Sequence, residues 1–412
     1  TYQLVSNPSN GTVTINGFDA TYTPNFGSTS NDSFEWTAND GTGVSNIAQV
    51  TLQYTPAIIF EKTYSMGNDQ SVAMDLKIAS DGGYIITGYT RTNGANNADV
   101  FLLKTDNNGN LDWNNTFAYN SSIQNHNGDE VQETSDGGYI IVGGADYNAY
   151  VIKVDSNGNK QWDKIYSNIG ATTFQDSRII TGKMNINETS DGGYFISIFD
   201  PNYSVDAFKI DSSGNLLWTT SAGSGTTLST VNNNQLAVLA DASITFFDSD
   251  GNQTSVSTFD EGGGNQIWHS SFEKTSDGGF VLGGATNSYD ATYNDAYLVK
   301  FDSSGLKEWY KTFIYSNSSE TAFEENGSFA IETSDQNYLL IGNNFSTGEL
   351  FIFKSDNDSD TSSEAAKIWQ KKIKYQSSET MGNVVREDSN GQYIIAGSTG
   401  ASTKKVYLIK IE

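Results

Sequence analysis

The stretch Ser80-Asp81-Gly82-Gly83-Tyr84-Ile85-Ile86 returns along the chain and decides the fold. Its closest copies are Ser135–Ile141, Ser190–Ile196 and Ser276–Leu282, and weaker copies are Asn232–Val238, Ser334–Leu340 and Ser389–Ile395. A repeat of this kind indicates an architecture built from one supersecondary unit. Seven copies in a sequence of strand type predict a closed ring, a seven-bladed β-propeller.

The first half of each unit is predicted to be a hairpin. Asp-Gly and Gly-Gly pairs favour the positive φ angles of two-residue hairpin turns. The apolar run Tyr84–Gly88 after the turn is typical of a buried inner strand. The stretch before the turn, Ser71–Ala79, alternates more loosely and is predicted to be the strand that precedes it.

The second half of the unit is Asp99–Trp113 in the first copy, where an apolar strand runs into a polar turn and a further strand begins at Trp113. Its relatives are Ala149–Trp162, Asp206–Trp218, Asp295–Trp309, Leu350–Trp369, the degenerate Ser243–Val256 and the incomplete Lys405–Glu412. Each unit therefore predicts four short strands, which make one propeller blade. We expect the turn to shape the hairpin and the Trp to pack between sheets.

The two ends of the repeat region are predicted to share one blade. The last copy stops after its third strand, and Phe60-Glu61-Lys62-Thr63-Tyr64 fits the missing fourth strand. We expect residues 58–64 to pair with residues 406–411. This pairing would remove an open sheet edge that invites aggregation.

Residues 1–55 do not fit the repeat and are predicted to be a separate small β-sandwich, with the propeller at 56–412. The order of Gly11–Ile15, Ala20–Pro24, Asp32–Trp36 and Ala48–Leu52 resembles the cadherin-like, immunoglobulin-type repeats of large bacterial surface proteins. The resemblance implies a further strand before Tyr2 and neighbouring tandem domains. Because Thr1 is not a natural start, we expect a mature or excised piece of a longer protein.

The repeat region resembles seven-bladed propellers of secreted bacterial and archaeal proteins. The motifs that carry the resemblance are Ser-Asp-Gly-Gly-Tyr-Ile-Ile-x-Gly and Lys-x-Asp-x-x-Gly-x-x-x-Trp, as at Ser80–Gly88 and Lys104–Trp113. The resemblance implies an extracellular or cell-surface location. It does not imply a shared ligand, because function lies in sites that are added to a fold.

The overall charge excludes some classes of partner. The 412 residues include 49 acidic and 23 basic side chains, for a net charge of −26. Phosphate binding needs clustered Lys and Arg, so we expect no nucleic-acid partner. No run of 18 apolar residues occurs, so no membrane insertion is expected. The absence of Cys excludes disulfides and thiolate sites.

The sequence predicts no cofactor, with calcium binding kept as the alternative. Asp106, Asn108, Asn110 and Asp112 place oxygen atoms at alternate positions, as calcium loops do, and Asp248, Asp250 and Asn252 are similar. An EF-hand needs Gly at its sixth position, where this chain has Leu111. We interpret both stretches, and the acidic turn Asn39-Asp40-Gly41, as plain turns.

No catalytic residue is assigned. The two histidines, His126 and His269, are interpreted as surface or blade-face residues rather than as a metal or acid–base site. Glu324-Glu325 and Asp129-Glu130 are the candidate carboxylate pairs of a glycosidase. Adjacent residues on a strand point to opposite faces, so we interpret each pair as a solvated acidic patch.

The leading functional hypothesis is a non-catalytic extracellular module that binds a glycan, a surface polymer or a protein. One alternative is a fibre subunit that assembles by strand addition, and another is a polysaccharide-active enzyme. Loops on a rigid scaffold carry function, so the irregular stretches are the places where a site is expected. These stretches are Gly223–Thr258, Asn357–Ala366, Asn232–Gln235 and Ser334–Asn337.

Overall fold

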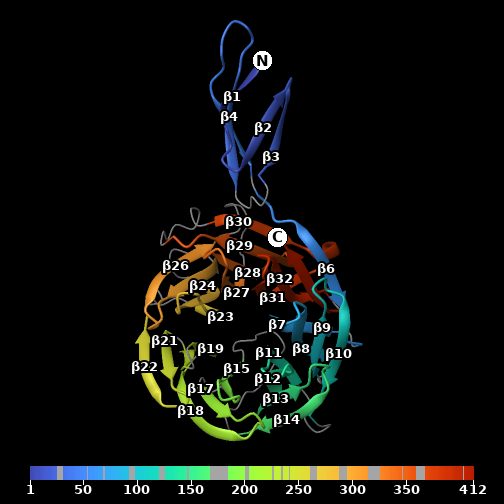
Figure 1. The fold of residues 1–412 in the computed structure, drawn as a ribbon, viewed down its shortest axis with the longest axis vertical. Coiled ribbons are helices and arrows are strands. Elements are labelled where there is room, and N and C mark those ends of the chain that lie inside the picture. Colours follow the sequence, from blue (N-terminus) through green and yellow to red (C-terminus); the bar gives the residue numbers. More distant parts are fainter. Residues whose placement is uncertain are drawn as a thin grey trace.

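The computed structural model shows an all-β chain in which two small sheets project from a ring of larger sheets (Figure 1). It describes residues 1–25, 31–52, 54–67, 70–91, 98–119, 126–145, 148–167, 184–199, 204–224, 227–232, 235–240, 242–259, 267–286, 295–313, 325–345, 347–358, 367–401 and 403–412. Within these ranges the helical content is one 3-10 turn, Tyr375–Ser377.

The N-terminal part consists of a three-stranded sheet and a hairpin. The sheet has the order β1 (Tyr2–Ser6), β4 (Asp32–Ala38), β5 (Ala48–Leu52), and the hairpin is β2 (Gly11–Asn16) with β3 (Asp19–Pro24). The Asp32 carboxylate joins the two sheets, because it accepts hydrogen bonds from the Ser9 amide at 2.8 Å and the Tyr22 hydroxyl at 3.0 Å.

The described residues of the ring form seven four-stranded antiparallel sheets, which we call blades and number in chain order. The first three blades are β7 (Gln70–Ile78), β8 (Tyr84–Arg91), β9 (Ala98–Thr105), β10 (Leu111–Phe117); β11 (His126–Glu133), β12 (Tyr139–Ala145), β13 (Asn148–Val154), β14 (Lys160–Tyr166); and β15 (Asn185–Glu188), β16 (Tyr194–Phe199), β17 (Ser204–Ile210), β18 (Leu216–Ser224). The next three are β19 (Thr227–Asn232), β20 (Gln235–Ala240), β21 (Ser243–Phe247), β22 (Gln253–Thr258); β23 (Ile267–Lys274), β24 (Phe280–Thr286), β25 (Asp295–Phe301), β26 (Lys307–Phe313); and β27 (Glu325–Glu332), β28 (Tyr338–Asn344), β29 (Glu349–Ser355), β30 (Lys367–Ile373). The seventh is β31 (Thr380–Glu387), β32 (Tyr393–Thr399), β33 (Lys405–Ile411) and β6 (Ile58–Tyr64).

The seventh blade joins the two ends of the ring. β6 pairs antiparallel with β33, and Val406 lies opposite Tyr64 while Lys410 lies opposite Phe60. Phe60 thus takes the place that Trp113 has opposite Lys104 in the first blade. The Tyr64 hydroxyl also donates to the Gly109 carbonyl of the first blade at 2.6 Å. The last blade is therefore held together by strands from both ends of the repeat region.

The turn of the repeated stretch is longer than the sequence predicts. The Ala79 amide donates to Gly83 O at 2.9 Å and the Gly82 amide donates to Ala79 O at 2.8 Å, so the hydrogen-bonded pair Ala79 and Gly83 encloses a turn of three residues rather than two. Only Gly82 has a positive φ, at 81°. Gly83 is required for a different reason, since a Cβ there would collide with the Thr105 carbonyl oxygen of the neighbouring strand.

The two halves of a unit meet in one ion pair, which we call the Lys–Asp clasp. In the first blade Lys104 Nζ lies 2.7 Å from Asp81 Oδ2, and the Lys side chain is buried while the Asp is half-exposed. The other clasps are Lys153–Asp136, Lys209–Asp191, Lys300–Asp277 and Lys354–Asp335, at 2.6 to 2.9 Å. The fourth blade replaces the Lys by the buried Phe246.

The clasps lower the pKa of their carboxyl groups. At Asp191 the hydrogen bond from Lys209, together with one from a threonine, lowers the pKa to about 2. At Asp136, Asp277 and Asp335 burial acts in the opposite direction, but hydrogen bonds from the matching lysine and threonine outweigh it and lower each pKa to about 2. An Asp in an unfolded chain titrates near about 3.9.

The free energy of unfolding is therefore expected to fall as the pH drops from about 4 to about 2. In that window the unfolded chain binds more protons than the folded chain, so stability rises with pH and is lost on acidification. Thermal melts across this range test the effect. Asp191→Asn should reduce the dependence of the melting temperature on pH, whereas Asp19→Asn, in the exposed N-terminal hairpin, should leave that dependence unchanged. An unchanged slope in Asp191→Asn would contradict this account.

Neighbouring blades are joined by contacts that the repeat supplies. The Glu133 carboxylate of the second blade accepts hydrogen bonds from the Ser80 amide and hydroxyl of the first, both at 2.6 Å. Equivalent Ser–Glu contacts are Ser135–Glu188, Ser276–Glu332 and Ser334–Glu387. Trp113 packs against the next blade, as predicted. Its ring lies so close to Gly158 of that blade that a Cβ added there would be only 2.6 Å from it.

Candidate functional site

The first strand of each blade faces the axis of the ring. β7, β11, β15, β19, β23, β27 and β31 lie innermost in Figure 1, while the fourth strands form the rim. Consecutive first strands also contact one another around the ring. Side chains that these strands turn toward the axis therefore meet, although they are about 50 residues apart in the sequence.

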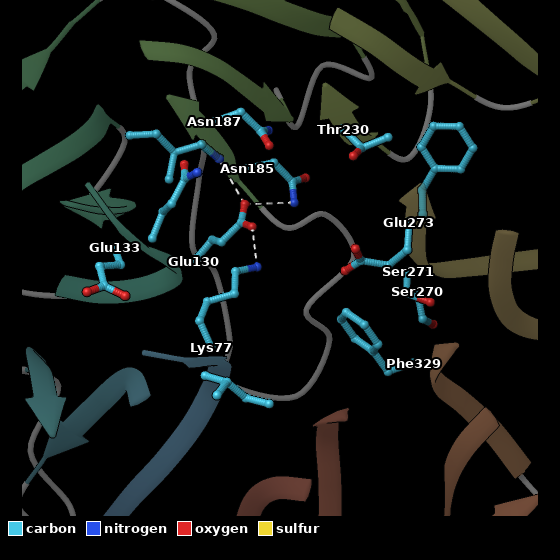
Figure 2. A pocket seen from close by; sticks show the side chains of 14 residues that line it. Lys77, Glu130, Glu133, Asn185, Asn187, Thr230, Ser270, Ser271, Glu273 and Phe329 are labelled. Carbon is cyan, nitrogen blue, oxygen red and sulfur yellow. Dashed lines mark hydrogen bonds and ion pairs between the residues drawn. The ribbon is translucent and has the colours of Figure 1, made fainter. Parts of the chain in front are cut away.

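A cavity of about 280 Å³ opens among these first strands. Six of them each contribute one of the following lining residues: Lys77, Glu130, Asn185, Thr230, Glu273 and Phe329. Figure 2 shows these side chains converging on the cavity from different sides. A concave site with a few convergent polar groups is the usual form of a small-molecule site.

β-Bulges aim several of these side chains. The first strands shift register between Ala73 and Asp75, Gly128 and Glu130, His269 and Ser271, Gly327 and Phe329, and Gly382 and Val384. An extra residue in one strand bends it and redirects the side chains that follow. Glu130, Ser271 and Phe329, which line the cavity, come directly after such a bulge.

Three charged lining residues, Lys77, Glu130 and Glu273, are joined through Asp75 and Arg386 in one chain of ion pairs, which we call the channel network. Lys77 Nζ lies 2.8 Å from Glu130 Oε1 and 3.4 Å from Asp75 Oδ2. Arg386 Nη2 lies 3.4 Å from Asp75 Oδ1 and 3.2 Å from Glu273 Oε1. Asp75 is almost fully buried and stands between the two cations. The network therefore links β7, β11, β23 and β31.

Burial and charge act against each other in this network. Burial raises the pKa of Glu130, although Lys77 and the Ile186 amide oppose the shift. For Lys77, burial and Arg386 lower the pKa, but the nearby carboxylates outweigh them and raise it. The Glu130 Oε2 atom accepts hydrogen bonds from the Ile186 amide at 2.8 Å and from Asn185 Nδ2 at 3.1 Å. Lys77 thus remains a fixed cation at neutral pH.

Phe329, the aromatic ring of the cavity wall next to Glu273, contacts the same network through Arg386. The Arg386 guanidinium carbon lies 4.6 Å from the centroid of the Phe329 ring, a cation–π distance. This contact holds the ring in place beside the polar wall. The cavity therefore combines fixed charges, amide groups and an aromatic ring before any ligand arrives.

Glu130, from one of the two carboxylate pairs considered in the sequence, lines this site. The interpretation of that pair as a solvated acidic patch is wrong, because Asp129 is 1% exposed and the Glu130 side chain 13%. Asp129 and Glu130 are adjacent, yet both bond to the third blade: Asp129 Oδ2 accepts from the Met184 amide at 3.4 Å and Glu130 from the Ile186 amide. The bulge at Asp129 breaks the alternation of faces. The partner of Glu130 is Lys77 rather than a second carboxylate.

Both histidines are buried inside the blades, not at the surface. His126 Nε2 accepts a hydrogen bond from the Tyr119 amide, and its Nδ1 lies 3.2 Å from the Ala98 carbonyl oxygen. His269 lies on β23, directly before its bulge. Neither lines the cavity.

The calcium-like stretches are hydrogen-bonded turns. Asp106 Oδ1 accepts from the amides of Asn108 and Asn110, at 2.9 and 2.7 Å, and Asp248 repeats this pattern. Asp40 likewise accepts from the Thr42 and Gly43 amides. Within the described ranges, no group of three His, Cys, Asp or Glu residues is arranged to hold a metal ion.

Some predicted locations lie outside the described residues. These are Glu324, residues 225–226, 233–234 and 241 of the fourth unit and residues 359–366 of the insertion, together with the side chain of Glu325. Ser334–Asn337 forms a turn like that of the other units, with Asp335 in its clasp. Most residues of the site therefore lie on the first strands of the blades, where the alternation of polar and apolar residues in the repeat is loosest.

The comparisons with known proteins bear on the fold. Residues 1–53 match the family model of the bacterial Ig domain. The WD40 domain of Neurospora crassa Pan2 is similar in structure, with a TM-score of 0.52 and 9% identity over 82% of this chain and 88% of that one. BBS1N, solved in complex with ARL6DN, has a TM-score of 0.50 and 8% identity over 87% of this chain and 97% of that one.

No curated protein matches the chain. In the part of the chain that the structure describes, no helix is long and apolar enough to cross a membrane. At identities this low the structural likeness bears on fold alone. The comparisons therefore confirm the predicted fold class: an all-β chain with an N-terminal Ig-like domain, here a bacterial Ig domain at residues 1–53, and a β-propeller.

Proposed function

We propose that this chain is an extracellular binding or adhesion module of a larger surface or secreted protein, and that its seven blades hold the ligand at the central channel. The observation that carries the proposal is the polar cavity lined by first strands of six blades. The bacterial Ig domain at residues 1–53 is compatible with a surface protein. The net charge of −26 favours a partner other than nucleic acid.

The preformed network supports binding rather than turnover. Each of the carboxylates Asp75, Glu130 and Glu273 faces a cation at 3.4 Å or less. A general acid or a nucleophile needs a carboxyl group that can exchange its proton or attack a substrate. Carboxylates held in ion pairs instead offer fixed hydrogen-bonding positions, which lower the cost of ordering a site on binding.

The test is a screen of the purified chain against a glycan array and against cell surfaces. Asn187→Trp, which places a large ring in the cavity, is expected to weaken the binding found at least tenfold. Asn114→Trp, on the exposed face of the outer strand β10, is the matched control and should bind normally. Degradation of a polysaccharide, or fibre formation without ligand binding, would overturn the proposal.

A further inference from the structure

We infer that the channel cavity takes an uncharged, hydroxyl-bearing saccharide end and discriminates against acidic sugars. The inference rests on the proposed function, because it names the ligand class for the same site. It follows from three features of the wall: mixed hydrogen-bonding groups, an excess of negative charge and an aromatic ring.

The wall offers donors and acceptors side by side. Arg386 engages one carboxylate oxygen of Glu273, and the other oxygen remains an acceptor at the cavity. Lys77 has three ammonium protons and faces two carboxylates, so it retains capacity to donate. Asn187 adds an amide and Thr230 a hydroxyl, each of which both donates and accepts.

A ligand that matches this wall must itself donate and accept. An ammonium group only donates, and at this wall it would approach a fixed cation, Lys77. A carboxylate or sulfate only accepts. Hydroxyl groups do both, and a sugar presents several of them in a fixed geometry. The alternation of groups around the cavity therefore favours a polyol over either kind of ion.

The charge balance disfavours an acidic ligand. The channel network contains three carboxylates, Asp75, Glu130 and Glu273, against two cations, so it carries one net negative charge. Glu133 adds a further carboxylate to the wall. In a partly buried site this charge is poorly screened by salt, so it disfavours uronic or sialic acids.

The aromatic ring and the size of the cavity complete the match. Arg386 packs on Phe329, and the ring also lines the cavity, where the C–H face of a sugar can pack against it. The volume of about 280 Å³ is near the lower limit of about 300 Å³ for small-molecule sites. The cavity thus suits the end of a glycan rather than the middle of a chain.

The experiment is saturation-transfer NMR and calorimetry with neutral disaccharides (lactose, cellobiose and mannobiose) and with their glucuronic-acid-terminated counterparts. At least one neutral sugar should bind at least tenfold more tightly than its acidic counterpart. Glu273→Gln keeps the shape but removes the charge, and should reduce this ratio toward one. Glu308→Gln, on the outer strand β26, is the matched control and should preserve it.

The outcomes separate this inference from the proposed function. Equal or tighter binding of the acidic sugars, or binding of a protein ligand but no saccharide, overturns the inference and leaves a binding module. Loss of all ligands in the array and cell screens overturns both. If Glu273→Gln does not fold, Asn187→Ala, which truncates a lining amide, must weaken neutral-sugar binding by about tenfold for the inference to stand.

Discussion

A chain that ends after Thr399 is expected to lose the cooperative unfolding transition of the propeller. The truncation removes β33, which lies between β32 and β6 in the seventh blade. The four side chains Val406, Tyr407, Leu408 and Ile409 are fully buried. Burial of each such side chain is worth about 1.5–3 kcal/mol, so their loss alone approaches the total stability of about 5–15 kcal/mol of a typical domain.

Circular dichroism melts and size-exclusion chromatography test this expectation. β6 would lose its partner strand and β32 would become an open edge, so aggregates should appear together with a broad melt. The control removes residues 1–53 instead, which spares the contact of Lys371 with the Pro56 carbonyl oxygen and should leave the melt of the ring within a few degrees. A cooperative, monomeric truncated protein would show that the ring does not depend on closure.

Arg386→Met is expected to lower the free energy of unfolding by about 3–5 kcal/mol. Removing one partner of a buried ion pair leaves the other charge buried and uncompensated. Here Glu273 loses its cation, and Asp75, whose side chain is 4% exposed, keeps only Lys77 at 3.4 Å. Phe329 also loses its cation–π contact, so the aromatic wall of the cavity should become less ordered.

Urea denaturation measures this effect as a shift of the midpoint at constant slope. Lys160→Met is the control, because Lys160 is 40% exposed and pairs with Asp163 within one strand. Exposed pairs contribute at most about 1 kcal/mol. Equal shifts in the two variants would mean that the channel network is solvated and contributes as little as a surface pair.

Much of the fold could be predicted from the sequence because the repeated residues make the turns and packing contacts that recur from blade to blade. Gly82 marks a positive φ, Trp113 marks the packing against the next blade, and Phe60 replaces a Trp where the ring closes. The length of the turn was predicted wrongly, because Gly83 is needed for close approach to Thr105 and not for its own backbone angle. The Lys–Asp clasp was missed, since its two residues lie in different halves of the unit.

The sequence pointed to two of the lining residues, Glu130 and Thr230 in the irregular fourth unit, and the rest of the candidate site was missed for two physical reasons. Its charges come from separate blades, and nothing in a single sequence shows that Lys77 meets Glu130 or that Arg386 meets Glu273. The bulges then break the alternation on which the choice of face relies, as at Asp129. The available signal was the presence of charged residues in the strands that precede the Gly-Gly turn, such as Asp75 and Lys77.

The Ser–Glu contacts between blades have a consequence for how this protein can change in evolution. The second and sixth units each carry both the Ser that the next blade binds and the Glu that binds the preceding blade: Ser135 with Glu133, and Ser334 with Glu332. A unit of this type that is duplicated or deleted as a whole therefore brings or removes a matched pair of contact residues. Gene segments of this kind can be gained or lost without designing a new interface, while the channel residues remain free to diverge from blade to blade.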